Sequence, residues 1–342
     1  MEDTGTRFVG FYTWPKFWVG AKLHPDEKIR PFLRAIMSKN SLSYNNEIYT
    51  LKISRDGMFI FRLEKLAQEI EKRRSENDYK PDLELTSHYL SYINAIIILF
   101  GSVLLETRSD YPLELQEITN KDIFLVLIKD DEWQGGSVPF NTLAGYHQME
   151  RFPQFLLPGI PLTHQSMFAG RKHVVKKTVI ELLVKYLNGI IKNYELISLL
   201  SQFTKSIYEF SLANYDTSLV LSWFIIERIV QEKWERSINS SNSTYPDGTK
   251  RINKDRFETL TGRDYPISVV SNILELSNII PFDLFKKVDK LRHYRNMIVH
   301  SDDRYKIQAD DCRLAFEVVT DLLEEKLGFR LKLNLNFHEV VL

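Results

Sequence analysis

The sequence predicts an α+β protein in which a mixed α/β N-terminal domain is followed by an all-α helical bundle. Alternating side chains over residues 47–61 predict a β-hairpin, and apolar residues recur at helical spacing from residue 174 to residue 327. Between these regions, residues 131–165 contain several prolines and a Gly-Gly pair, which is typical of an irregular connection. We therefore expect three parts: a mixed domain at 1–165, a helical bundle at 166–330 and a C-terminal strand at 331–342.

The mixed domain opens with an aromatic stretch at residues 7–20, which we expect to form a strand and a core-packed turn at Pro15. Residues 47–61 form the hairpin, because Arg55-Asp56-Gly57 supplies residues that favour a tight turn. The pattern that follows predicts two helices and then two further strands: Leu63–Glu76, Leu85–Thr107, Leu113–Ile118 and Ile123–Ile128.

Apolar spacing of 3.6 residues predicts the helices of the second half, with Asn188-Gly189 ending the first of them and Gly328 ending the last. A loop rich in serine and asparagine is expected at residues 238–250. Residues 330–337 alternate as in a half-buried strand, which we expect to join the sheet of the first domain. The predicted helices are Val174–Leu187, Tyr194–Tyr215, Ser218–Arg236, Lys254–Leu260, Ile267–Leu276, one that starts at Pro281-Phe282-Asp283, and Asp310–Leu327.

The composition limits the function classes. Lys+Arg and Asp+Glu both number 45, so any attraction to nucleic acid must come from local patches and not from the net charge. The single cysteine, Cys312, excludes an intrachain disulfide and lies in a helical apolar pattern, which indicates a small buried residue. The acidic start shows no secretory signal, and the apolar run Ala95–Leu105 is shorter than a bilayer span. We therefore expect a cytoplasmic protein with no membrane segment.

The residues that carry chemistry lie in the helix beginning at Phe282. Arg295-Asn296 is followed by three apolar residues and then by His300, so Asn296 and His300 share a helix face. We expect Asn296 to hydrogen-bond the imidazole of His300 and Arg295 to flank the site. Metal-free RNA cleavage needs a group that moves protons near neutral pH and a cation for the developing phosphorane charge, and histidine and arginine supply these. A plain helix end, where Arg and His interact with the dipole, also fits the pattern.

This stretch resembles the signature of the HEPN superfamily, in which an Arg and a polar residue precede a His on one helix of a small bundle. The resemblance covers about the last 130 residues and implies a HEPN-like bundle. It further implies a metal-independent endoribonuclease that leaves 2′,3′-cyclic phosphate ends and acts as a toxin or phage-defence effector. By the same resemblance, the site would form in a homodimer from two copies of the motif, and its activity would be controlled by an antitoxin or a phage trigger. Its catalytic residues here would be Arg295, Asn296 and His300.

Other residues have supporting roles in this interpretation. Glu227 stands among apolar residues and is expected to orient an arginine of the motif helix, such as Arg292 or Arg295, although a solvated helix edge fits Glu227 equally. A basic run could bind RNA through Lys286, Lys287 and Lys290. We find no phosphate-binding loop, nucleophile elbow or metal-ligand spacing, so no metal or cofactor is expected. The rival hypothesis is a non-catalytic HEPN-like module that dimerises or binds a nucleotide or partner.

Overall fold

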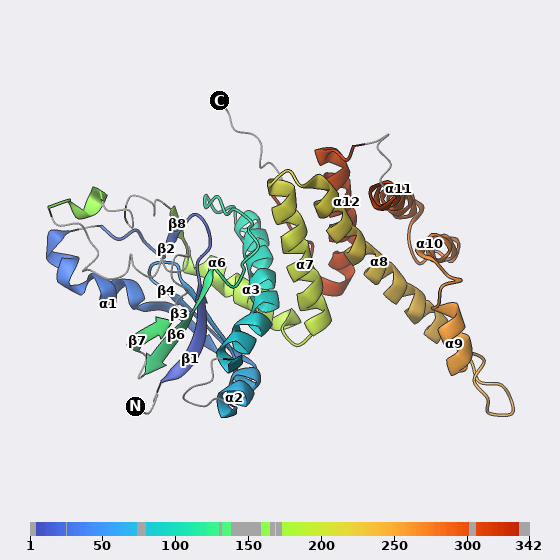
Figure 1. Ribbon diagram of the computed structural model, residues 1–342, viewed down its shortest axis with the longest axis horizontal. Helices are drawn as coiled ribbons and strands as arrows, with labels where there is room; N and C mark the ends of the chain where they lie inside the picture. The colour runs from blue at the N-terminus through green and yellow to red at the C-terminus, as the bar shows by residue number, and fades with distance from the viewer. Residues whose placement is uncertain are drawn as a thin grey trace. The chain divides into compact units, whose positions relative to one another are not determined.

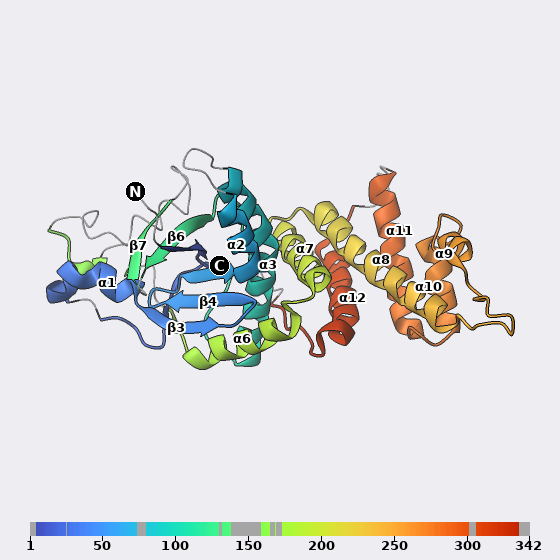
Figure 2. The ribbon, with the colours of Figure 1, turned by 90° about the horizontal axis from the view of Figure 1, so that it is seen from below.

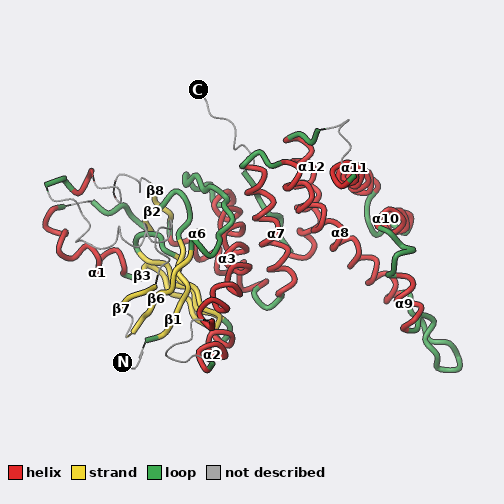
Figure 3. Tube along the Cα trace, viewed as in Figure 1, coloured by secondary structure: helices red, strands yellow, loops and turns green. Residues whose placement is uncertain are grey.

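A computed structural model describes residues 5–24, 26–73, 80–129, 132–137, 159–164, 168, 173–300 and 306–334 of the chain. It contains an N-terminal antiparallel sheet with helices, followed by a helical region, which confirms the α+β class (Figure 1, Figure 3). The chain forms two compact units, one made of residues 1–204 with 332–334 and the other containing residues 205–331. This division falls later than the expected boundary at 165/166, because the helices between residues 177 and 204 belong with the sheet.

The sheet of the first unit is six-stranded and antiparallel, with the order β3-β4-β5-β1-β6-β7. The N-terminal strand β1 lies in the middle, so that Val9 faces Phe61 on one side and Leu125 on the other. The expected hairpin is confirmed as β4 and β5, which turn at residues 55–57. The strands are β1 (Thr6–Phe11), β3 (Asn40–Asn45), β4 (Tyr49–Ser54), β5 (Phe59–Leu63), β6 (Ile123–Lys129) and β7 (Glu132–Ser137).

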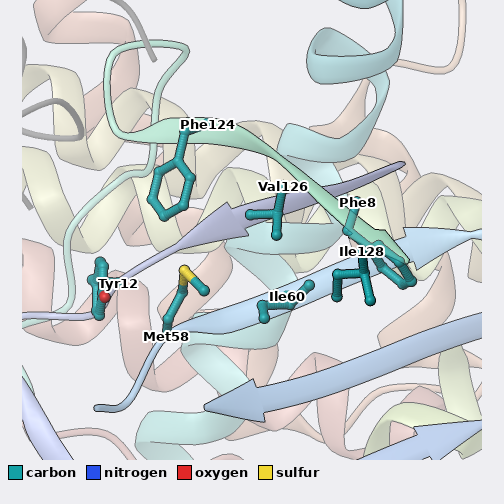
Figure 4. Packing of buried hydrophobic residues seen from close by; sticks show 7 residues of the cluster. All are labelled: Phe8, Tyr12, Met58, Ile60, Phe124, Val126 and Ile128. Carbon is teal, nitrogen blue, oxygen red and sulfur yellow. The ribbon is translucent and has the colours of Figure 1, made fainter. Parts of the chain in front are cut away.

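Both faces of this sheet are apolar and buried, because bulky side chains occupy the odd and the even positions of the central strands. One face carries the cluster shown in Figure 4, formed by Phe8, Tyr12, Met58, Ile60, Phe124, Val126 and Ile128. On the other face, Phe59 and Phe61 meet the long helix α3 (Lys80–Glu106), with ring centroids 5.3 Å from Phe100 and 5.6 Å from Tyr89. The expectation that the aromatic stretch at 7–20 forms core is confirmed for Phe8, Phe11, Tyr12, Phe17 and Trp18. It is wrong for Trp14 beside the turn, which is 42% exposed.

The remaining elements of the first unit are mostly helical. Helix α2 packs on α3 and on β5, and the two helices lie side by side in both views (Figure 1, Figure 2). A short two-stranded parallel sheet joins β2 to β8. The bounds of these elements are β2 (Phe17–Val19), a 3-10 turn at Glu27–Phe32, α1 (Leu33–Ser38), α2 (Glu64–Lys72), β8 (His173–Val175), α6 (Lys177–Ile190) and α7 (Tyr194–Ser211).

Two expectations about the sheet region are wrong. Leu113–Ile118 does not form a strand, because the side chain of Asn94 on α3 hydrogen-bonds both backbone groups of Ile118. Oδ1 of Asn94 accepts from the Ile118 N at 2.8 Å, and Nδ2 donates to the Ile118 carbonyl at 3.0 Å. Part of the expected irregular connection at 131–165 is regular: β7 includes Gly135 and Gly136 and pairs with β6. Apart from residues 132–137 and 159–164, that connection lies outside the described residues.

The helices around residue 190 also differ from expectation. Helix α6 begins three residues later than Val174, because residues 173–175 pair with β2. It also continues through Asn188-Gly189 to Ile190, since the Asn188 side chain is held by Tyr44 and Tyr49, each at 2.9 Å. The helix expected at 194–215 is α7, which ends earlier, at Ser211, because Ala213 adopts a left-handed φ of 60°. The next helix, expected at 218–236, correspondingly starts earlier, at Tyr215.

The second unit is helical in its described part. The long helix α8 (Tyr215–Ser240) packs against α10, α11 and α12. Helices α9 (Lys254–Leu260) and α10 (Ile267–Leu276) have the predicted bounds. Helix α12 (Ala309–Leu327) ends at Gly328, which adopts a left-handed φ of 74° as predicted. Cys312 is fully buried on α12, and burial raises the pKa of its thiol to about 12. This confirms a packing role for the cysteine and disfavours a reactive thiolate.

The C-terminal strand expected from residue 330 is not formed at residues 330–334, and residues 335–337 lie outside the described part. Residues 332–334 nevertheless belong to the first unit, where the backbone N of Lys332 donates to the Ser102 hydroxyl of α3 at 2.9 Å. This stretch therefore joins the first unit at a helix and not as a further strand of its sheet.

Among the described residues, the stretch His88–Glu106 of α3 is long and apolar enough to cross a membrane by length and composition alone. The expectation that no apolar segment reaches that length is therefore wrong. About 67% of the stretch is buried inside the protein, where it covers the sheet. A core helix of this kind passes the same test, so the finding is weak in either direction.

Candidate functional site

The predicted motif lies at the C-terminal end of helix α11 (Phe282–Val299). Pro281 precedes the helix with an extended backbone, and Asp283 in the first turn complements the helix dipole, so the start agrees with the prediction. The helix ends at His300, whose backbone N donates to the carbonyl of Asn296 at 3.0 Å. Only Val288 and Leu291 of α11 are fully buried, so much of this helix faces solvent.

Arg295 and Asn296 contact each other directly. Nη1 of Arg295 donates to Oδ1 of Asn296 at 3.2 Å, and both side chains are half-buried. The Nε atom of Arg295 is buried, and no described residue accepts its hydrogen. A buried donor without an acceptor is uncommon in folded proteins, so the Nε hydrogen of Arg295 is unusual among the described residues.

His300 is exposed, and within the described part of the chain its ring makes no hydrogen bond. The expected bond between Asn296 and the imidazole is therefore not formed there; Asn296 accepts from Arg295 instead. On an ideal helix, residues five positions apart differ by about 140° around the axis. Arg295 and His300 of one copy therefore diverge from each other.

Glu227 lies on α8, which packs on α11, and is half-buried. The expected pairing with a motif arginine is absent among the described residues, since Arg295 binds Asn296 and Arg292 binds Asp289. Trp223, one turn earlier on α8, is buried, and its indole Nε1 has no described acceptor.

The sequence reasoning did not identify a polar cluster on the same helix, formed by Asp289, Arg292 and His293. Oδ1 of Asp289 accepts from Nε and Nη2 of Arg292 at 3.1 and 2.8 Å. Its other oxygen lies 3.5 Å from Nε2 of His293, which is itself 3.2 Å from Arg292. The sequence contained the signal for this cluster. Asp289 precedes Arg292 by three positions and His293 by four, which places all three side chains on one helix face.

The lysines proposed to bind RNA have partners within the protein. Lys286 pairs with Asp283 at 2.8 Å and lies 4.7 Å from the ring centre of Phe282. Lys287 pairs with Glu317 of α12 at 2.7 Å, and this hydrogen bond raises the pKa of Lys287. Lys290 lies over the ring of Tyr294 at 5.5 Å. Because carboxylates already offset two of these charges, α11 offers less free positive charge than its sequence indicates.

Among the described residues, no three His, Cys, Asp or Glu side chains gather closely enough to hold a metal ion. The expectation that the chain uses no metal or cofactor stays a prediction. Comparisons with protein-family models, curated proteins and solved structures find no significant match to this chain. The resemblance to the HEPN superfamily therefore rests on the residues of α11 and on the order of the helices.

Proposed function

We propose that the second unit is a HEPN-type endoribonuclease that cleaves RNA without a metal and uses Arg295 and His300. The observation that carries the proposal is the state of these two side chains. The imidazole of His300 is exposed, and the guanidinium of Arg295 is held at one end by Asn296 with its Nε hydrogen unused. An available imidazole and a fixed guanidinium are the two groups that this chemistry requires.

In the proposed reaction, the 2′-oxygen of the RNA attacks the adjacent phosphorus while the bond to the 5′-oxygen breaks. One group accepts the proton of the 2′-hydroxyl, and another gives a proton to the departing 5′-oxygen, leaving a 2′,3′-cyclic phosphate and a 5′-hydroxyl end. His300 transfers protons, Arg295 offsets the growing charge on the phosphate oxygens, and Asn296 orients Arg295. The last role replaces the expected contact between Asn296 and the imidazole.

One copy of the motif supplies one imidazole, whereas the reaction needs a proton acceptor and a proton donor. Arg295 and His300 of one chain also diverge around the helix. A homodimer in which two α11 helices face each other resolves both points. It brings the His300 imidazoles of both chains to one site, and Arg295 of one chain then approaches His300 of the other. In this proposal the protein acts as a toxin or antiviral effector, and the first unit restrains it or responds to a phage trigger or an antitoxin.

A non-catalytic module that dimerises or binds a partner is the second candidate. The pairing of Lys286 with Asp283, of Lys287 with Glu317 and of Arg292 with Asp289 favours this candidate, because it leaves little positive charge on α11 for RNA. Both candidates predict a dimer, so RNA cleavage is the property that separates them.

The test is incubation of the purified full chain with end-labelled RNA in excess chelator. The wild type should cut, and both Arg295→Ala and His300→Ala should lower the rate by a factor on the order of 100 or more. His293→Ala removes another exposed histidine of α11, and Arg236→Ala removes an exposed arginine of α8 that pairs with Glu232. These two controls should cut like the wild type, and all four variants should keep the wild-type melting temperature.

Intact RNA with every protein, or normal cleavage by Arg295→Ala and His300→Ala, would support the non-catalytic module. If the enzyme is inactive until a trigger is present, growth of cells that express it is the second measurement. Expression of the wild type should then arrest growth during phage challenge, with recovery in His300→Ala but not in His293→Ala. Equal growth of all strains, together with intact RNA, rules the nuclease proposal out.

A further inference from the structure

The first unit contains a pocket of about 510 Å³ that the proposed nuclease chemistry does not use. It lies where β5 leads into α2, beside α3 and the connection between α6 and α7. Its size falls within the range of small-molecule sites, roughly 300–1,000 Å³. The pocket is lined by apolar and aromatic side chains (Ile48, Leu63, Leu66, Tyr92 and Tyr194) and by four side chains that can carry charge (Glu47, Lys65, His88 and Lys192).

The aromatic part of the lining offers a surface for a planar group. The ring of Tyr194 is 59% exposed and lies 6.1 Å from that of Tyr92, which in turn lies 6.3 Å from the buried ring of Phe61. Burial and the nearby Tyr194 raise the pKa of Tyr92, so its hydroxyl stays protonated and able to donate at neutral pH. An exposed tyrosine supported from behind by further rings is suited to stacking on a flat ligand.

The charged part of the lining is mainly positive. Lys65 of α2 and Lys192 of the α6–α7 connection are exposed, and neither pairs with an acid among the described residues. Lys287 and Lys233 of the second unit differ in this respect, since each binds a carboxylate of α12. Two unpaired ammonium groups from separate elements at one pocket are suited to an anionic group such as a phosphate.

The walls of the pocket are held by contacts that do not involve these lysines. The backbone N of Glu64 donates to the carbonyl of Ile48 at 2.9 Å, and its carboxylate accepts from Thr50 at 2.7 Å. The hydroxyl of Tyr89 accepts from the backbone N of Leu63 at 2.7 Å. These bonds fix the β5–α2 junction, so a ligand meets a pocket formed beforehand and loses less free energy in ordering it.

We infer that this pocket binds a mononucleotide, with the base against Tyr194 and Tyr92 and the phosphate between Lys65 and Lys192. Glu47 supplies an acceptor at the same opening for an exocyclic amine or a ribose hydroxyl. The site lies wholly within the first unit and does not depend on the nuclease proposed for α11. Nucleotide binding there makes the occupancy of the first unit depend on the cellular concentration of the mononucleotide.

Titration calorimetry of the full chain with adenosine and uridine 5′-monophosphates tests the inference, with adenosine, inorganic phosphate and decanoate as further probes. The mononucleotides should bind saturably, and adenosine and phosphate should each bind about tenfold more weakly or not measurably. The double variant Lys65→Ala/Lys192→Ala should lose about tenfold in affinity or more. The matched control Lys22→Ala/Lys28→Ala removes two exposed lysines of the same unit that do not line the pocket, and it should bind like the wild type.

Tyr194 separates a stacking role from a structural one. Tyr194→Phe keeps the ring and should keep the wild-type affinity, whereas Tyr194→Ala should lose about tenfold with an unchanged melting temperature. Four results would each overturn the inference: no saturable nucleotide binding up to about 10 mM, unchanged binding by the lysine double variant, equal binding by Tyr194→Ala, or binding of decanoate alone. None of these outcomes bears on RNA cleavage by Arg295 and His300, so the two proposals fail separately.

Discussion

Gly57 illustrates how a single residue fixes the sheet of the first unit. It closes the turn between β4 and β5 with a left-handed φ of 79°, and a Cβ placed there would lie 2.6 Å from the backbone oxygen of Phe17. No side chain fits at that distance, and most residues other than glycine also resist this backbone conformation.

Gly57→Ala should therefore lower the free energy of unfolding by about 2 kcal/mol or more, from the backbone cost together with the collision. Gly159→Ala is the matched control, since Gly159 has a φ of 75° but nothing within 4 Å of the added Cβ. It should cost only about 1 kcal/mol. Urea unfolding followed by circular dichroism measures both, and equal losses would mean that the contact with Phe17 is of no consequence.

At the scale of residues, the sequence predicted where the candidate site residues lie better than it predicted which side chains they contact. Spacing alone placed Arg295, Asn296 and His300 at one end of a helix, and Cys312 in the core, as observed. It could not show that Asn296 binds Arg295, because a helix lets a short polar side chain reach several neighbours and only the packed structure selects one.

Helices α8 and α12 form the most extensive helix contact of the second unit, and ion pairs cross between them. Lys233 of α8 binds Glu325 of α12, and Glu232 of α8 binds Lys326. The hydrogen bond from Lys233 holds the pKa of Glu325 below its ordinary value of 4.5. A carboxylate whose pKa is lowered in the folded state adds stability above its ordinary pKa and loses it as the pH falls through the lowered one.

Glu325→Gln should accordingly reduce the free energy of unfolding at pH 7 by on the order of 0.5 kcal/mol, a small amount because the side chain is 61% exposed. The difference from the wild type should shrink once the pH drops below 4.5, as Glu325 becomes protonated in both states. Urea unfolding at pH 7 and near pH 3.5 measures it. Glu235 of α8 forms no ion pair among the described residues, so Glu235→Gln should show neither effect. A difference between Glu325→Gln and the wild type that is the same at both pH values would contradict the argument.

At the scale of elements, spacing located the helices of the second half, and the strand prediction failed where a side chain distant in sequence intervened. Apolar spacing located α9 and α10 with their bounds. The stretch Leu113–Ile118 was predicted to be a strand, yet Asn94 binds the backbone of Ile118 and keeps it out of the sheet. A partner 24 residues away in sequence leaves no trace in local periodicity.

The whole molecule consists of two units whose roles we propose to be separate, a ligand pocket in the first and a nuclease in the second. The fold class followed from the sequence because alternating and helical spacing occur together in the first half, whereas helical spacing dominates the second. The position of the boundary between the units could not be predicted, because the sequences of α6 and the start of α7 resemble bundle helices. Only their packing assigns them to the first unit.

The need for two proton-transfer groups leads to a prediction for the assembled protein. If one site takes His300 from both chains, a mixed dimer of the wild type and His300→Ala has a single imidazole and should be inactive. Co-expression in equal amounts should then leave about a quarter of the wild-type activity, because only a quarter of the dimers contain two wild-type chains.

The same RNA cleavage assay measures this loss, with different affinity tags on the two chains to verify that mixed dimers form. Co-expression of two differently tagged wild-type chains is the control and should keep full activity. About half of the wild-type activity, with mixed dimers verified, would show that each chain supplies its own proton-transfer groups.

The bond between Lys332 and Ser102 joins residues 230 positions apart within the first unit. A ribosome makes residues 332–334 only after every helix of the second unit has been synthesised. The first unit can therefore collapse early but acquires this backbone contact only after the second unit has been synthesised, so a chain that stalls before residue 332 leaves that part of α3 without it.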